Sequence, residues 1–115
     1  PDEVADIQSR VKEAVSAGTS LVLITGGTGL SPRDVTPEAV RPLLDKEIEG
    51  IAETIRSYGQ DRTPYAMLSR SVVGTIGNSL VLALPGSTKG ATESMEAIFP
   101  ALLHIFKVLK GARHE

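Results

Sequence analysis

Apolar residues along the chain alternate between a helical period and the short runs that are typical of strands. Spacings of three and four positions predict a helix over residues 3–17, closed by Gly18. Residues 21–24 form a continuous apolar run, as in a strand that is covered on both faces in a parallel sheet. Apolar runs at 72–76 and 80–84, with a short polar turn between them, predict a hairpin.

The segments between and after these strands predict further helices. Thr36 is suited to be an N-cap before Pro37, and helices are expected at 37–45 and 47–58, followed by a polar loop. The last helix is expected over 88–110.

Pro100 should bend this last helix, because its ring clashes with the carbonyl four residues earlier. Helices and strands alternate along the chain. We therefore expect an α/β fold with three layers, helix–sheet–helix, and a mostly parallel sheet plus one antiparallel hairpin.

Composition narrows the functional classes. The chain has 115 residues, 41% hydrophobic residues and a net charge of −2, as expected for one globular domain and not for a nucleic-acid-binding protein. The absence of cysteine excludes disulfides and thiolate metal sites, and fits a reducing, cytoplasmic location. No apolar run approaches the roughly 20 residues that cross a membrane, and no signal peptide is visible.

Two loops at strand ends carry the first candidate chemistry. Residues 25–29 read TGGTG, and side-chain-free residues expose consecutive N–H groups that suit phosphate. Residues 84–87 read LPGS and place a hydroxyl where the last helix begins. Two such turns on one sheet edge favour a phosphorylated ligand, although each could be an ordinary strand-end turn.

The remaining candidates are less specific. Arg33 could pair with phosphate and Asp34 could hold Mg²⁺, or both could be ordinary loop residues. Arg70 and its neighbouring serines could contact phosphate or solvent. Ser79 fits a hairpin turn, and Asp2 fits a helix cap.

Four motifs occur together in the order 25–29 (TGGTG), 32–39 (PRDVTPEA), 67–70 (MLSR) and 84–87 (LPGS). In this order and approximate spacing they resemble the MogA/gephyrin G-domain family, the molybdopterin adenylyltransferases and their MoaB relatives. The resemblance covers essentially all of the chain.

This resemblance implies a specific reaction and a set of site residues. Family members bind molybdopterin, a pterin dithiolene with a terminal phosphate, and use Mg-ATP to adenylylate that phosphate with release of pyrophosphate. Asp2 and Asp34 would be the catalytic and Mg²⁺-binding pair. The substrate- and nucleotide-binding residues would be Gly26, Gly27, Thr28, Gly29, Arg33 and Thr36, with Ser69, Arg70, Ser79, Pro85, Gly86 and Ser87 towards the pterin.

The resemblance also leaves alternatives open. MoaB-like or gephyrin-like members would be non-catalytic molybdopterin-binding or trimeric scaffold modules, and a generic nucleotide or phosphosugar binder would need only the glycine turns. A homotrimer is expected, with other molybdenum-cofactor enzymes fused or associated. Because family members begin with a further strand and helix, residues 1–115 are expected to be one molybdopterin-binding domain that is incomplete at its N-terminus.

Overall fold

The computed structural model describes residues 2–111, apart from the side chain of Asp2. Within this range, four strands form one sheet in the order β1-β4-β3-β2. The elements are α1 (Asp2–Ser16), β1 (Leu21–Thr25), α2 (Thr36–Val40), β2 (Lys46–Glu47), α3 (Glu49–Gln60), β3 (Val72–Ile76), β4 (Ser79–Leu84) and α4 (Thr88–Leu109), with 3₁₀ turns at Arg41–Leu43 and Ala66–Leu68.

The predicted α/β class and the β3–β4 hairpin are confirmed. The prediction of a mostly parallel sheet is not met by the described strands: β1 and β4 are parallel, whereas β4–β3 and β3–β2 are antiparallel. The sheet is mixed because the hairpin and β2 lie side by side at one edge and leave β1 as the parallel partner.

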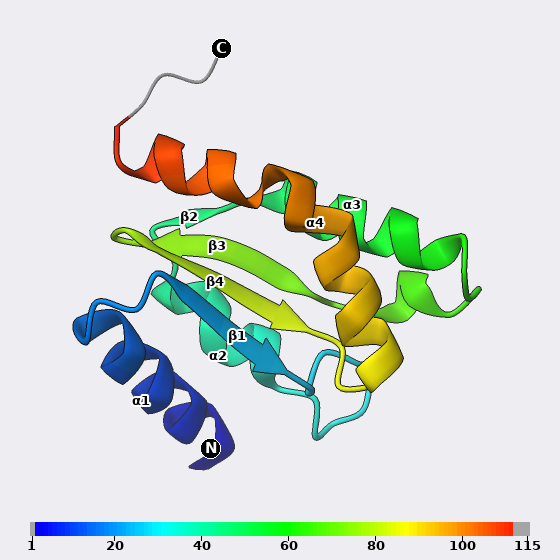
Figure 1. The fold of residues 1–115 in the computed structure, drawn as a ribbon. Coiled ribbons are helices and arrows are strands. Elements are labelled where there is room, and N and C mark those ends of the chain that lie inside the picture. The colour runs from blue at the N-terminus through cyan, green and yellow to red at the C-terminus, as the bar shows by residue number, and fades with distance from the viewer. Residues whose placement is uncertain (1, 112–115) are drawn as a thin grey trace.

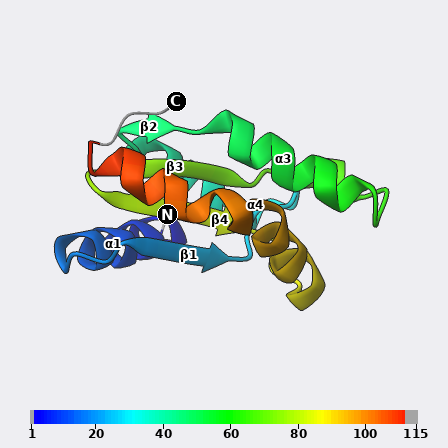
Figure 2. The ribbon, with the colours of Figure 1, turned by 45° about the horizontal axis from the view of Figure 1, so that its top comes forward.

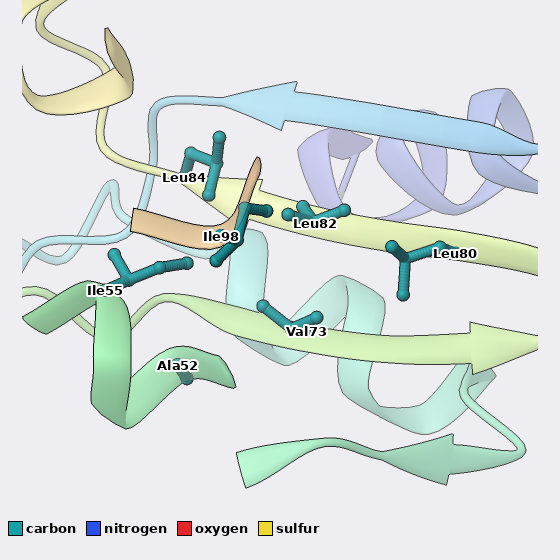
Figure 3. Close-up of a cluster of buried hydrophobic side chains, with 7 residues drawn as sticks. All are labelled: Ala52, Ile55, Val73, Leu80, Leu82, Leu84 and Ile98. Carbon is teal, nitrogen blue, oxygen red and sulfur yellow. The ribbon is translucent and has the colours of Figure 1, made fainter. Parts of the chain in front are cut away.

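Helices cover both faces of the sheet, which gives the three predicted layers (Figure 1). On one face, α1 and α2 pack Ile7 and Val40 against Val72, Val81 and Ala83. On the other face, α3 and α4 close the larger core cluster (Figure 3), which consists of Ala52, Ile55, Val73, Leu80, Leu82, Leu84 and Ile98.

The region predicted as a helix over 37–45 is divided in the structure. Helix α2 ends at Val40, and a 3₁₀ turn follows in which Leu44 donates its N–H to the carbonyl of Arg41. Pro42 has no N–H for the carbonyl four residues earlier, so an α-helix cannot continue through it. The chain then pairs with β3 as the two-residue strand β2, before α3 begins two residues later than predicted.

Helix α4 confirms the predicted bend. It contains Pro100 and changes direction near its middle (Figure 1), and Figure 2 shows its first half beginning beyond the arrowheads of β1 and β4. Ile98 is buried against the sheet, whereas Phe99 and Leu103 on the outer side are 68% and 78% exposed.

Strand β1 is less covered than predicted. It lies at an edge of the described sheet, and Leu23 is 46% exposed although it was expected to be covered. The reason is that α3 and α4 pack over β3 and β4, while α1 and α2 cover the side of β1 that carries Val22 and Ile24.

Candidate functional site

The two predicted glycine turns lie side by side at the carboxyl edge of the parallel strands. Thr25 at the end of β1 is in register with Leu84 at the end of β4, and Gly26 donates its N–H to the carbonyl of Leu84 at 2.9 Å. A Cβ on Gly86 would lie 3.0 Å from the Cα of Gly26, so the backbones approach too closely for a larger residue. Adjacent parallel strands therefore bring the glycine loop (residues 25–29) against the second turn (residues 85–87).

Thr36 anchors the glycine loop from below. Its buried hydroxyl donates to the carbonyl of Gly26 at 2.9 Å, and its backbone N–H donates to the carbonyl of Gly27 at 3.1 Å. The prediction that Thr36 is the N-cap of α2 is wrong, because Val35 occupies that position and the Thr36 hydroxyl is used by the loop.

The carboxylate of Asp34 lies close to Gly29, at the end of the same loop. The N–H of Ser31 donates to its Oδ2 at 2.9 Å, and the N–H of Asp34 returns a bond to the carbonyl of Ser31 at 2.9 Å. A Cβ at Gly29 would lie 2.7 Å from Oδ2, so glycine is what allows the carboxylate to sit there. Within residues 2–111, Oδ1 of Asp34 has no hydrogen-bond partner and is available to a ligand.

Arg70 connects three segments around the site. Its backbone N–H donates to the carbonyl of Thr28 at 2.7 Å, Nε to the carbonyl of Gly29 at 2.8 Å, and Nη2 to the carbonyl of Asp34 at 2.6 Å. Nη1 donates to Oε2 of Glu38 at 2.6 Å. This hydrogen bond lowers the pKa of the Glu38 carboxyl and raises that of the Arg70 guanidinium.

Hydroxyl groups continue from the glycine loop towards α3. The Thr28 hydroxyl lies 3.5 Å from that of Ser69, which lies 2.9 Å from the buried hydroxyl of Ser71. Arg56 donates to the carbonyls of Ser69 and Ser71 at 3.4 and 3.3 Å. Helix α3 therefore supports the segment that carries Ser69.

These segments enclose an open hollow of about 540 Å³ at the strand ends. Its lining combines loop backbone, hydroxyls and one carboxylate with apolar side chains: Gly26, Gly27, Thr28, Gly29, Leu30, Asp34, Tyr65, Leu68, Ser69, Pro85, Gly86 and Ser87. A smaller hollow of about 190 Å³ adjoins it between α3 and the start of α4, and shares Tyr65, Ser69, Pro85 and Ser87 with it. The Ser87 hydroxyl also caps α4 by accepting from the N–H of Gly90 at 3.0 Å.

Nine of the predicted site residues line the hollow: Gly26, Gly27, Thr28, Gly29, Asp34, Ser69, Pro85, Gly86 and Ser87. Thr36 and Arg70 lie behind this lining and hold its loops, and Arg33 is exposed on the loop outside it. The side chain of Asp2 is outside the described residues, although its backbone begins α1.

Ser79 does not belong to this set. It begins β4, whereas the hollow lies at the other end of that strand, about 17 Å away at the usual rise per residue. Its buried hydroxyl donates to the carbonyl of Thr19 and so fixes the turn before β1. The prediction that Ser79 contacts the pterin is therefore corrected to this structural role. Ser79 follows the hairpin turn between β3 and β4, and this turn lies at the end of the sheet away from the hollow.

Sequence reasoning missed four residues around the site. Leu30, Tyr65 and Leu68 line the hollow with exposed apolar surface, and Glu38 is the partner of Arg70. Tyr65 could have been identified from the sequence, since it is one of only two tyrosines and an aromatic residue in an otherwise polar loop is a candidate for ligand contact. Glu38 could not, because a glutamate in a first helical turn is explained by the helix dipole alone.

The metal prediction can be compared with the donor set. Among residues whose side chains are described, no three His, Asp or Glu side chains cluster as ligands for one ion. A single carboxylate with a free oxygen beside the glycine loop still fits Mg²⁺, which is bound through one or two carboxylates, water and substrate phosphate. In the part of the chain that the structure describes, no helix combines the length and apolarity needed to cross a bilayer.

An open hollow lined by loop backbone, at the point where adjacent parallel strands end, is the place where α/β domains commonly bind small molecules. Comparison with known proteins gives the family. The sequence model described as "Probable molybdopterin binding domain" matches residues 1–104, and the chain belongs to this family.

Its relatives and structural neighbours carry related names. The chain is 43% identical to molybdenum cofactor biosynthesis protein B of Staphylococcus aureus over 94% of its own length and 66% of that protein. It is 39% identical to the molybdenum cofactor biosynthesis bifunctional protein of Chlorobaculum tepidum, over 99% of the chain and 36% of that protein. The solved structure of the molybdopterin biosynthesis enzyme MoaB from Thermus thermophilus is similar with a TM-score of 0.87 and 48% identity, covering 100% of this chain and 73% of that one.

The chain thus spans about a third of the bifunctional relative and two thirds of protein B. The chain is therefore a member of the molybdopterin-binding family, and the relatives reported above are named as proteins of molybdenum cofactor biosynthesis.

Proposed function

We propose that this domain binds molybdopterin and adenylylates its terminal phosphate with Mg-ATP, releasing pyrophosphate. The observation that carries the proposal is the convergence of the glycine loop, the second turn and Asp34 on one hollow in a chain of the molybdopterin-binding family.

The lining suits each part of the substrates. The glycine loop offers backbone N–H groups and the Thr28 hydroxyl to phosphate. The adjoining smaller hollow, walled by Pro85 and Ser87 at the start of α4, is proposed to hold the pterin ring. Leu30 and Leu68 would exclude water from the phosphates, which strengthens polar contacts to them.

The proposed reaction requires positioning more than covalent catalysis. An oxygen of the pterin phosphate attacks the α-phosphorus of ATP, and the bond from that phosphorus to the leaving pyrophosphate breaks. Asp34, together with Asp2, is proposed to hold Mg²⁺, which when bound would neutralise phosphate charge. The chain's own contribution is to hold the two phosphates in line on the glycine loop.

A second candidate is a non-catalytic molybdopterin-binding or trimeric scaffold module. The exposed Phe99 and Leu103, one turn apart on the outer side of α4, form an apolar stripe of the kind that subunit contacts cover. A homotrimer is proposed for either function. Association with, or fusion to, another molybdenum-cofactor enzyme is proposed because one relative is named a bifunctional protein. A cytoplasmic location is proposed as well, since the chain contains no cysteine.

The test incubates the full-length protein with molybdopterin, ATP and Mg²⁺ and measures adenylated pterin. Asp34→Asn should abolish turnover while pterin binding is largely retained, and Asp61→Asn, on an exposed residue after α3, serves as the matched control. Pterin binding without turnover in the unaltered protein would favour the binding module. Turnover that survives Asp34→Asn would contradict the role given to this carboxylate.

A further inference from the structure

Most of the hydrogen-bond donors of the Arg70 guanidinium are engaged by other groups of the protein. A guanidinium has five N–H donors. Nε donates to Gly29, Nη1 to Glu38, and Nη2 to both Asp34 and Glu38. Four donors are therefore engaged, and at most one remains for a ligand.

The acceptors of these bonds are the backbone of the site itself. The carbonyls of Gly29 and Asp34 lie at the two ends of the segment that follows the glycine loop, and the backbone N–H of Arg70 holds the carbonyl of Thr28 just before it. The side chain of Arg70 is absent from the lining of the hollow, whereas the neighbouring Ser69 belongs to it.

Glu38 completes the arrangement. Its two carboxylate oxygens accept from Nη1 at 2.6 Å and from Nη2 at 3.3 Å, which is the bidentate geometry that fixes the plane of a guanidinium. With this plane fixed, Nε and Nη2 point to the two loop carbonyls at the same time.

We propose that Arg70 is a positioning residue: with Glu38, it holds the backbone around Asp34 in the geometry that presents the free carboxylate oxygen to the ligand. Only the kinetic consequences of this proposal rest on the proposed function; the structural role of Arg70 does not. It replaces the sequence-based role of Arg70 as a substrate-binding residue.

Lysine cannot reproduce this role, because a single ammonium lacks the planar fork that reaches two carbonyls and a carboxylate together. In Arg70→Lys the segment between Gly29 and Asp34 should open more often. Amide hydrogen exchange at Ser31 and Asp34, whose N–H groups bond within this segment, should accelerate by about tenfold or more. Amides of the buried strand β4 should keep their protection.

The kinetic signature separates positioning from direct phosphate binding. Loss of a positioning residue should lower kcat by about tenfold or more and leave the KM for ATP within about twofold. Glu38→Gln should show the same pattern more weakly. If Arg70 instead bound phosphate, Arg70→Lys would raise KM without faster exchange, and Glu38→Gln would release the guanidinium for the ligand and leave kcat intact.

Arg41→Ala is the matched control, since it removes another bidentate Arg–Glu pair, with Glu47, that makes no bond to the loop. Exchange at Ser31 and Asp34 should be unchanged in it. Because exchange is measured without substrates, it decides the positioning role even if the adenylylation proposal fails. Unchanged exchange at both amides in Arg70→Lys and in Glu38→Gln would overturn the inference.

Discussion

Replacing Thr36 by valine removes one hydroxyl and almost no volume from beneath the glycine loop. The lost bond is the 2.9 Å donation to the carbonyl of Gly26 from a side chain in a residue that is 3% exposed. A typical intramolecular hydrogen bond contributes about 1 kcal/mol, and leaving a buried acceptor unpaired costs about 1–3 kcal/mol. Gly26 is half-buried, so water can reach its carbonyl in part.

The expected loss in the free energy of unfolding is therefore about 1–2 kcal/mol, equivalent to about 4–8 °C in Tm for a domain of this size. It is measured by urea denaturation followed by far-UV circular dichroism. Thr54→Val is a matched control, because the Thr54 hydroxyl donates to the carbonyl of Gly50 at 2.8 Å in an exposed turn of α3. Solvent replaces that bond, so the control should change stability by less than about 0.5 kcal/mol.

Equal losses of unfolding free energy in Thr36→Val and Thr54→Val would refute the reasoning. They would mean that the buried hydrogen bond to Gly26 contributes no more stability than the solvent-exposed hydrogen bond to Gly50. Affinity for inorganic pyrophosphate provides a second measurement on the same variants. It should fall in Thr36→Val and stay unchanged in Thr54→Val, because only the first loosens the glycine loop.

Three further predictions concern the core, the cap of α4 and the Arg70 pair. Leu82→Ala, in the fully buried centre of β4, should cost about 2–5 kcal/mol in chemical denaturation, whereas the same truncation at the exposed Leu30 should stay within about 0.5 kcal/mol. Ser87→Ala removes the cap of α4 and should cost about 1 kcal/mol, read as a lower denaturation midpoint. The hydrogen bond from Arg70 lowers the pKa of Glu38 below its ordinary value of 4.5. The ionised pair therefore stabilises the fold at pH values above 4.5, and this contribution is lost as the pH falls through the lowered pKa. Glu38→Gln should be less stable than the unaltered protein at pH 7, and the difference should vanish as the pH falls through the lowered pKa; a gap that persists at lower pH would contradict this assignment.

Local chain patterns were sufficient to predict most of the fold. Helix α1, the β3–β4 hairpin and the bend at Pro100 follow from apolar period, turn residues and a missing N–H, which are properties of neighbouring residues. Strand β2 could not be predicted in this way, because its two exposed residues become a strand only by pairing with β3. Tertiary contact decides such short elements.

The site shows the same division. That the turns after β1 and β4 would lie at one edge of the sheet was predictable, since both follow apolar runs typical of strands, and parallel strands have their carboxyl ends at the same edge. The roles of Thr36 and Arg70 were not, because motif position places a residue near a site without saying whether it faces the ligand or the loop behind it. Hydrogen bonds across 10 and 36 positions of sequence settle that question only in three dimensions.

The pairing of β1 with β4 also has a consequence for folding. The register joins Leu21 to Leu80, so about half of the chain must be closed into a loop before the two glycine turns can touch. Closing such a loop is entropically costly and slows the formation of non-local pairings. The hollow should therefore appear with the last cooperative step of folding, not in any partly folded form that contains the hairpin alone. A bound ligand would then slow global unfolding and not merely local opening, because breaking the hollow means separating the strands that close the whole domain.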